Sequence, residues 1–229
     1  MRNFAPISLA LCFLAGSRNA QPQGVRVIDE GSFSISVNGQ RTGRENFSIT
    51  GTPTGEGIDY IAKATVVYGD RRLSPSLHAD SAGTPSQYMV QISNTGGQQE
   101  RWKGTIRRGR VSATIQSPRG ESQKEFVVTE GALILDDDVY HQYYFVAHRA
   151  TNGNLTVVIP RRNSQLPLRV ASAGTDRVTV GTREIDARHL VLTEGDGTQR
   201  DVWVDAQGRV LKVAIPARGI VAVRDDPPR

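Results

Sequence analysis

The stretch "VWVDAQGRVLKVAIP", Val202–Pro216, contains two runs of alternating side chains that are separated by a polar turn. In an extended strand, successive side chains point to opposite faces, so Val202 and Val204 share one face and Trp203 lies on the other. Gly208 can adopt the left-handed backbone conformation of a tight turn. The stretch therefore predicts a β-hairpin whose valines pack into a core. Because the first strand is apolar on both faces, we expect a helix or a neighbouring strand to cover Trp203.

The second strand of this hairpin alternates in the same way. Its predicted faces are Leu211, Val213 and Ile215 on one side and Val210, Lys212 and Ala214 on the other. The same pattern recurs along most of the chain, for example in "GSFSISVNGQRTGRENFSI", residues 31–49. Turns are predicted at Asn38-Gly39, Gly69-Asp70, Thr95-Gly96-Gly97, Arg108-Gly109 and Pro118-Arg119-Gly120. A turn about every 8–12 residues is typical of an antiparallel meander, sandwich or barrel.

One segment departs from this rhythm. "LILDDDVYHQYYFVAHRAT", residues 133–151, contains neither glycine nor proline and places Val139, Tyr143 and Val146 at helical spacing. It predicts a helix from Asp138 to Arg149, with Asp136 or Asp137 as its N-terminal cap. The predicted fold class is all-β (a β-rich α+β fold), with a large curved antiparallel meander, half-barrel or barrel-like, and one substantial helix near residues 138–149.

The beginning of the chain has the layout of a secretory signal peptide. Arg2 precedes an apolar run from Ile7 to Ala15, and small and polar residues follow. This run is shorter than the about 20 apolar residues that span a bilayer. We predict a signal peptide over residues 1–20, cleaved between residues 17 and 21 at a bond that the sequence does not fix. The rest, residues 21–229, is predicted to be a single β-rich domain without a transmembrane segment, located in the periplasm or, alternatively, secreted.

The only cysteine lies inside the predicted signal peptide. Cys12 follows Leu11, and the apolar run continues after it, so the sequence does not favour cleavage and lipidation at this residue. The mature chain would then contain no thiol and no disulfide, and its hydrophobic core alone would have to stabilise it.

The formal net charge of the chain is +5, but its basic residues are scattered and mostly alternate with apolar ones. A nucleic-acid-binding protein would show a continuous basic stripe. We therefore expect solvated strand faces and no nucleic-acid partner. Weak attraction to anionic lipid headgroups remains open.

No catalytic or metal-binding motif stands out. In "DDDVYH", residues 136–141, the consecutive carboxylates point in different directions, so metal binding with His141 and His148 is disfavoured. We expect a helix cap followed by surface histidines. The sequence lacks a Gly-x-Ser-x-Gly elbow, a calcium loop and a glycine-rich loop ahead of a helix. No cofactor, metal ion or catalytic residue is predicted.

Two stretches carry a resemblance. "REIDARHLVLTEGDGTQRDVWVDAQGRVLKVAIPARGIVAVRDD", residues 183–226, and "NGQRTGRENFSI", residues 38–49, resemble exported bacterial proteins of uncharacterised families, in which such a hairpin ends a large curved sheet. That architecture is similar to the half-barrel of periplasmic lipoprotein carriers and their glycolipid-binding relatives. The resemblance covers about half of the chain and implies a curved sheet that holds acyl chains against a helix. It carries over no individual site residue.

Aromatic residues provide the candidate ligand-binding set, which is Tyr60, Trp102, Tyr140, Tyr143 and Tyr144. They line an inner space if the sheet curls over the helix, and the alternative is ordinary core packing. Three functions follow. The first is a non-enzymatic, soluble envelope protein that binds a lipid or other apolar ligand between sheet and helix. The second is a structural or interaction module that engages an envelope protein partner. The third, least favoured, is a hydrolase with an unrecognised site.

Overall fold

The computed structural model describes residues 24–149 and 153–229. The predicted signal peptide and Cys12 lie outside these residues. The first half of the chain forms β1 (Arg26–Val37), β2 (Gln40–Thr54), β3 (Gly57–Tyr68), β4 (Arg71–Ala79), β5 (Pro85–Asn94), β6 (Gln99–Arg107), β7 (Arg110–Ser117) and β8 (Gly120–Val127). The second half forms β9 (Leu133–Ile134), α1 (Tyr143–Arg149), β10 (Gly153–Ile159), η1 (Pro160–Arg162), β11 (Ser164–Val180), β12 (Arg183–Glu194), β13 (Gln199–Val204), β14 (Val210–Ile215), η2 (Pro216–Arg218) and β15 (Ile220–Arg224).

These strands form one 15-stranded sheet in the order β8-β7-β6-β5-β4-β3-β2-β1-β15-β14-β13-β12-β11-β10-β9. Every pair is antiparallel except β9–β10, which is parallel. The sheet therefore runs as a meander in both directions from the pair that β1 makes with β15. All five predicted turns connect strands, and at Asn38-Gly39 and Arg108-Gly109 both residues have positive φ, as a two-residue hairpin turn requires.

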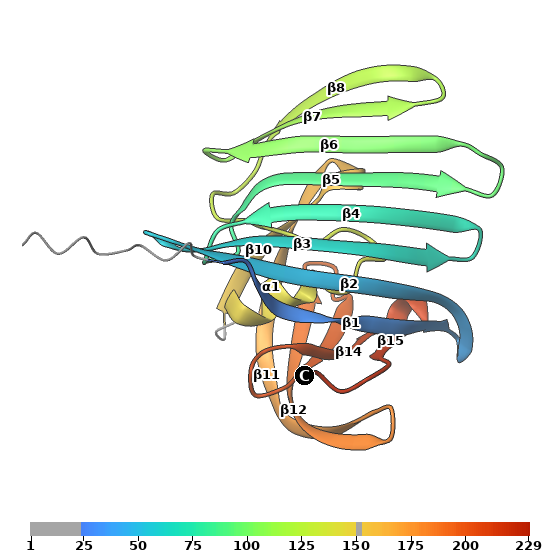
Figure 1. The fold of residues 1–229 in the computed structure, drawn as a ribbon, viewed down its shortest axis with the longest axis vertical. Helices are drawn as coiled ribbons and strands as arrows, with labels where there is room; N and C mark the ends of the chain where they lie inside the picture. Colours follow the sequence, from blue (N-terminus) through green and yellow to red (C-terminus); the bar gives the residue numbers. More distant parts are fainter. Residues whose placement is uncertain (1–23, 150–152) are drawn as a thin grey trace, which may run out of the picture.

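The sheet curls into a roll that is not closed. Its two end strands are β8 and β9, and β9 lies beside β5 rather than beside β8. Strands β1–β8 form a broad wall, α1 and β10 lie behind it, and the sheet continues below β1 with β15, β14 and β12 (Figure 1). Strands β6–β8 extend beyond the point where β9 meets the wall, and we call them the wing (Gln99–Val127). The predicted curved, barrel-like meander is confirmed. Among the described residues, no helix has the length and apolar character needed to cross a membrane.

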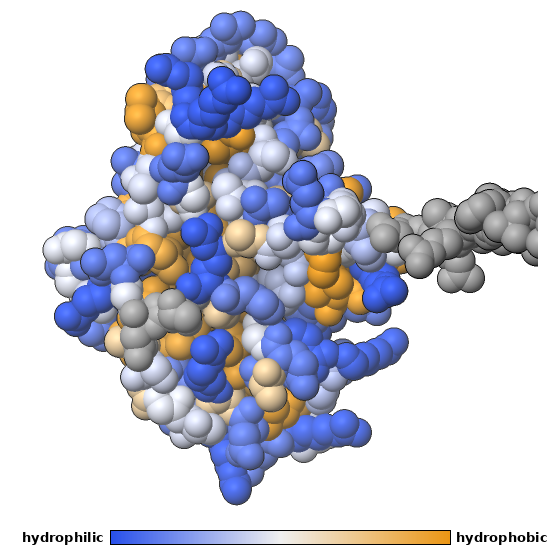
Figure 2. Space-filling view, turned by 90° about the vertical axis from the view of Figure 1, so that its left-hand side faces the viewer, coloured by the Kyte–Doolittle hydropathy of each residue, from blue (hydrophilic) through white to orange (hydrophobic). Residues whose placement is uncertain are grey.

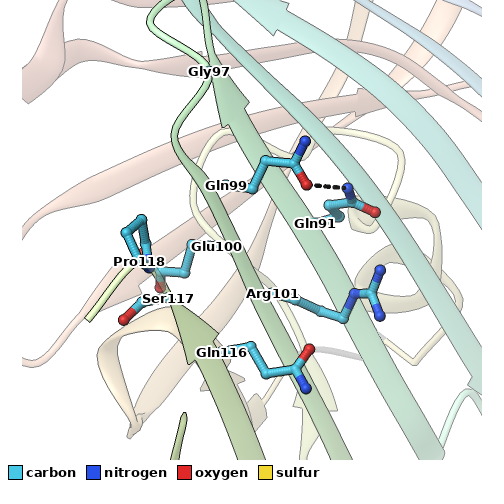
Figure 3. A pocket seen from close by; sticks show the side chains of 8 residues that line it. All are labelled: Gln91, Gly97, Gln99, Glu100, Arg101, Gln116, Ser117 and Pro118. Atoms are coloured by element: carbon cyan, nitrogen blue, oxygen red, sulfur yellow. Dashed lines mark hydrogen bonds between the residues drawn. The ribbon is translucent and has the colours of Figure 1, made fainter. Parts of the chain in front are cut away.

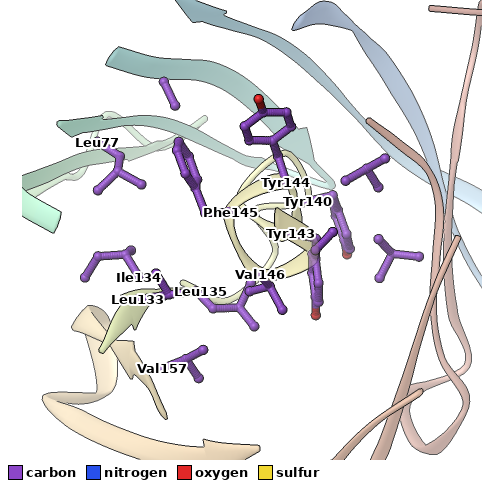
Figure 4. Close-up of a cluster of buried hydrophobic side chains, with 14 of the residues drawn as sticks. Leu77, Leu133, Ile134, Leu135, Tyr140, Tyr143, Tyr144, Phe145, Val146 and Val157 are labelled. Carbon is purple, nitrogen blue, oxygen red and sulfur yellow. The ribbon is translucent and has the colours of Figure 1, made fainter. Parts of the chain in front are cut away.

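The helix is shorter than expected, and its first five residues are buried. It begins at Tyr143 rather than Asp138 and ends at Arg149 as predicted. Asp138 has a φ of 61°, which excludes it from a right-handed helix. The residues from Tyr143 to Ala147 are all buried, because α1 lies inside the roll and not on its surface. We call Asp136–Arg149 the plug, and Figure 4 shows its buried side chains Tyr140, Tyr143, Tyr144 and Phe145 pointing into the core in different directions.

The hairpin from Val202 to Pro216 is present as β13 and β14. Val202 and Val204 are buried in the main core, as predicted. A β-bulge between Trp203 and Val204 pairs Val204 with Val210, so Leu211 is left as the extra residue on the opposite face from Val213. The predicted grouping of Leu211 with Val213 and Ile215 is therefore wrong. An inserted residue reverses the alternation at that point.

Trp203 is covered, as predicted, by neighbouring strands. The far ends of β11 and β12, which we call the arm (Thr175–Arg188), pack over the outer face of β13 and β14. Four buried residues form a small second core there: Val178, Val180, Ala187 and Leu211. Trp203 and Ile185 are half-buried against it. The two faces of this hairpin therefore belong to two different cores.

Candidate functional site

The five predicted aromatic residues pack into the core as two groups. Tyr60 lies edge-on to Tyr144, with ring centroids 6.3 Å apart, on the side of the plug that faces β3. Tyr140 and Tyr143 are buried on other sides of the same plug (Figure 4). Trp102 lies elsewhere, beside the Tyr88 ring at 5.8 Å. These residues therefore do not form one continuous lining between the helix and the sheet.

A buried carboxylate that the sequence analysis missed attaches the plug to the wall. Glu45 of β2 is fully buried and accepts hydrogen bonds from the backbone N–H groups of Tyr140 (2.6 Å) and His141 (2.9 Å). It also lies 2.5 Å from Nδ1 of His141, whose ring stacks on Phe47. The sequence contains a signal for this buried carboxylate. Glu45 alternates in phase with Phe47 and Ile49 along the strand, so its side chain points to the same buried face.

His141 is thus not the surface residue that was expected, although His148 is exposed. The predicted cap is also wrong. The Asp136 carboxylate accepts hydrogen bonds from the Tyr88 hydroxyl (2.8 Å) and from Nε of Arg161 (2.9 Å) instead of capping α1. Burial raises the pKa of Asp136, and the charge of Arg161 opposes that shift. Burial raises the pKa of Tyr88 as well.

These polar contacts attach the plug to the rest of the roll. Each joins the plug to a strand or to η1, and Arg200 likewise donates to the Tyr143 hydroxyl at 3.1 Å. In the part of the chain that the structure describes, three buried polar atoms of the plug lack a hydrogen-bond partner: Tyr140 Oη, His141 Nε2 and Gln142 Nε2. Buried groups of this kind are commonly satisfied by ordered water. No three His, Cys, Asp or Glu side chains of residues 24–149 and 153–229 converge as a metal site.

The wing offers a different kind of surface. Its inner face continues the core outward, because Ile106 pairs with Val111, Val111 pairs with Phe126, and Trp102 pairs with Ile115 across the strands. Trp102 and Val111 are fully buried, whereas Ile106, Ile115 and Phe126 are half-buried. The apolar strip thus runs from the core to β8, an end strand of the sheet. The sequence shows these alternating residues but not that they extend beyond the plug.

The outer face of the wing is polar. Together with Gln91 of the neighbouring strand β5, its residues Gln99, Arg101 and Gln116 line a shallow depression with a volume of about 380 Å³ (Figure 3). The Gln91 side chain donates to that of Gln99 at 3.5 Å. These side chains lie on a solvated sheet face. In the space-filling view, the wing is mostly hydrophilic and the apolar surface gathers below it (Figure 2).

The fold and interior define the class of this protein, which is an all-β, barrel-like roll that encloses a short helix. The chain belongs to the family described as a domain of unknown function, DUF6134, whose model matches residues 98–224. That match includes the wing, the plug and all strands from β9 to β15. No curated protein matches the chain.

Two solved structures are similar to it. The crystal structure of a β-barrel-like protein of the domain of unknown function DUF1849 from Brucella abortus matches 89% of this chain and 98% of that chain, with a TM-score of 0.58 and 9% identity. A DUF1089 family protein from Pseudomonas aeruginosa matches 79% of this chain and 88% of that chain at 14% identity, but its TM-score of 0.39 is too low to support an argument. The first likeness establishes a shared barrel-like fold and no more.

Proposed function

We propose that this protein is exported to the periplasm or secreted, and that it binds the apolar part of a lipid, or another apolar molecule, without catalysing a reaction. Its binding surface is the inner face of the wing. The observation that carries this proposal is the apolar strip that leads from the core to the unclosed edge of the sheet, where Ile106, Ile115 and Phe126 are half-buried.

This location differs from the one that the sequence suggested. The space between α1 and the sheet is filled by the plug's own side chains, because the residues from Tyr143 to Ala147 are all buried in protein. An acyl chain would lie beside the plug and under the wing. Each methylene that leaves water contributes about 0.8 kcal/mol, so the methylenes of a chain of 16 to 18 carbons can supply about 12 kcal/mol, from which the cost of association is subtracted.

The test is a titration of the purified protein with a fluorescent fatty acid of 16 to 18 carbons. Phe126→Ser places a hydroxyl on the inner face of β8 and should weaken binding by about tenfold, since a large apolar contact is lost. Val127→Ser is the matched control, because Val127 is the next residue of the same strand and is 69% exposed. Saturable binding that Phe126→Ser leaves unchanged, or no binding at all, would contradict the proposal.

The filled interior favours a second candidate, a structural or interaction module of the envelope without a small ligand. Its contacts would be made by outer surfaces and strand edges. The β8 edge carries Glu121, Lys124 and Glu125, and charged side chains on an edge strand oppose unspecific pairing with other chains. A protein that binds no fatty acid, with its fold intact, would favour this candidate.

A further inference from the structure

The arm follows a β-bulge between Ser172 and Gly174, where the pairing register of β11 and β12 shifts. Beyond it, β11 pairs only with β12 among the described strands, and the arm lies over the outer face of β13 and β14. The second core beneath it is small, with four buried residues. Such a core provides limited stability, so polar contacts at the base of the arm have a large influence on whether it stays attached.

His189 lies at this base, between two carboxylates from different strands. Its Nε2 is 2.9 Å from Oδ1 of Asp201 on β13, and its Nδ1 is 3.1 Å from Oδ2 of Asp176 on the arm. The imidazole ring stacks on Trp203 with centroids 4.3 Å apart. The Trp203 indole in turn donates its N–H to Asp176 at 2.8 Å.

An imidazole carries a hydrogen on both ring nitrogens only when it is protonated. The neutral ring turns a lone pair toward one of the two carboxylates and loses that hydrogen bond. The other basic side chains near the arm do not bridge Asp176 and Asp201. Lys212 of β14 lies over the Trp203 ring at 4.4 Å from its centroid, and Arg177 of the arm pairs with Glu184 and Asp186, each at 3.5 Å. His189 is therefore the side chain that joins Asp176 to Asp201.

We propose that His189 is a pH-responsive clasp that holds the arm against the outer face of the roll. While its ring is protonated, His189 bridges Asp176 and Asp201 and the arm is fixed. When the ring loses one proton, one bridge is lost and the arm loosens. Loosening exposes Trp203 and widens the groove beside it, which has a volume of about 520 Å³ and is also lined by Lys212, Val221 and Val223.

This inference goes beyond ligand binding at the wing and does not depend on it. The arm and the wing lie at different places on the sheet, because β11 and β12 are separated from β6–β8 by the strands between them in the sheet order. Failure of one proposal therefore leaves the other standing.

Hydrogen–deuterium exchange of the full chain at pH 5.5 and pH 8.0 tests the clasp, with rates normalised to the intrinsic exchange at each pH. We expect the protection of arm peptides to fall by about tenfold at the higher pH, the effect of one charge-assisted hydrogen bond. His189→Gln should remove this pH dependence. His78→Gln should preserve it, because His78 lies on β4, away from the arm.

Arm protection that is equal at both pH values, or a pH dependence that persists in His189→Gln, would overturn the proposal. If His189→Gln does not fold, Asp176→Asn serves as the second variant, since it removes one of the two carboxylates that require the doubly protonated ring. Its pH dependence should be clearly smaller than that of the wild type. An undiminished dependence would contradict the clasp.

Discussion

Glu45 connects the wall of the roll to the plug with one carboxylate. It accepts two backbone N–H groups and contacts the His141 ring, and no part of it is exposed. An amide at this position can accept one of these bonds but turns its own N–H groups toward the other donors. We expect Glu45→Gln to lower the free energy of unfolding by about 2–3 kcal/mol in urea denaturation.

The control for this variant is an exposed glutamate. Glu125→Gln on β8 affects a 3.7 Å ion pair with Arg110, in which both side chains are more than half exposed, and an exposed 3.3 Å hydrogen bond that Glu125 accepts from the Ser112 hydroxyl. Its effect should stay within about 0.5 kcal/mol. Equal stability of Glu45→Gln and Glu125→Gln would show that the plug does not depend on the buried carboxylate.

Individual buried charges could be inferred from the sequence only in part. Glu45 falls in the apolar phase of its strand, and this phase was a usable signal. Asp136 carried no such signal, because three consecutive aspartates before aromatic residues are a common helix start. Its partners Tyr88 and Arg161 come from distant parts of the chain, and only the folded sheet brings them to it.

At the scale of elements, the plug is the feature on which the interior depends. Val139 is 1% exposed, in the turn segment between β9 and α1. Replacing it with aspartate buries a carboxylate at a site packed by an apolar side chain, so we expect Val139→Asp to destabilise the protein by about 3 kcal/mol or more. Thermal or urea unfolding measures this. Val67→Asp is the control on an exposed strand position, and an equal midpoint for both variants would contradict the packing described.

In the hairpin of β13 and β14, the loss of stability should depend on how much of the Trp203 ring is removed. Trp203 is half-buried against the second core, so Trp203→Ala should cost about 1.5–3 kcal/mol, less than the roughly 3–5 kcal/mol of a fully buried tryptophan. Trp203→Phe should recover much of that loss, because an aromatic ring still packs against the second core. Urea denaturation of the three proteins measures the free energy of unfolding. An alanine variant as stable as the wild type would show that the arm does not need this contact.

Strands were predictable because a strand with one buried face alternates with period two, and turn residues mark its ends. The bulge at Leu211 was not, since a single inserted residue leaves the local composition unchanged and only reverses the phase. The helix was predicted five residues too long, because its periodicity continues into a segment that tertiary hydrogen bonds hold in a turn.

At the scale of the whole molecule, the roll remains open. The chain pairs β1 with β15 but leaves β8 and β9 as separate ends, so the wing extends past the plug with an apolar inner face. The sequence predicted a curved sheet around a helix. It could not predict where the sheet stops closing, because this depends on how fifteen strands curl together and not on any local pattern.

The most direct test of the proposed function is native mass spectrometry of the protein expressed in a bacterial envelope and purified without detergent. We expect the mass of a chain whose first residue lies between 18 and 22, together with the mass of a co-purifying lipid or fatty acid. Phe126→Ser should lose that adduct, and Val127→Ser should retain it. A fully processed protein that carries no apolar ligand, or an adduct that Phe126→Ser retains in full, would contradict the account.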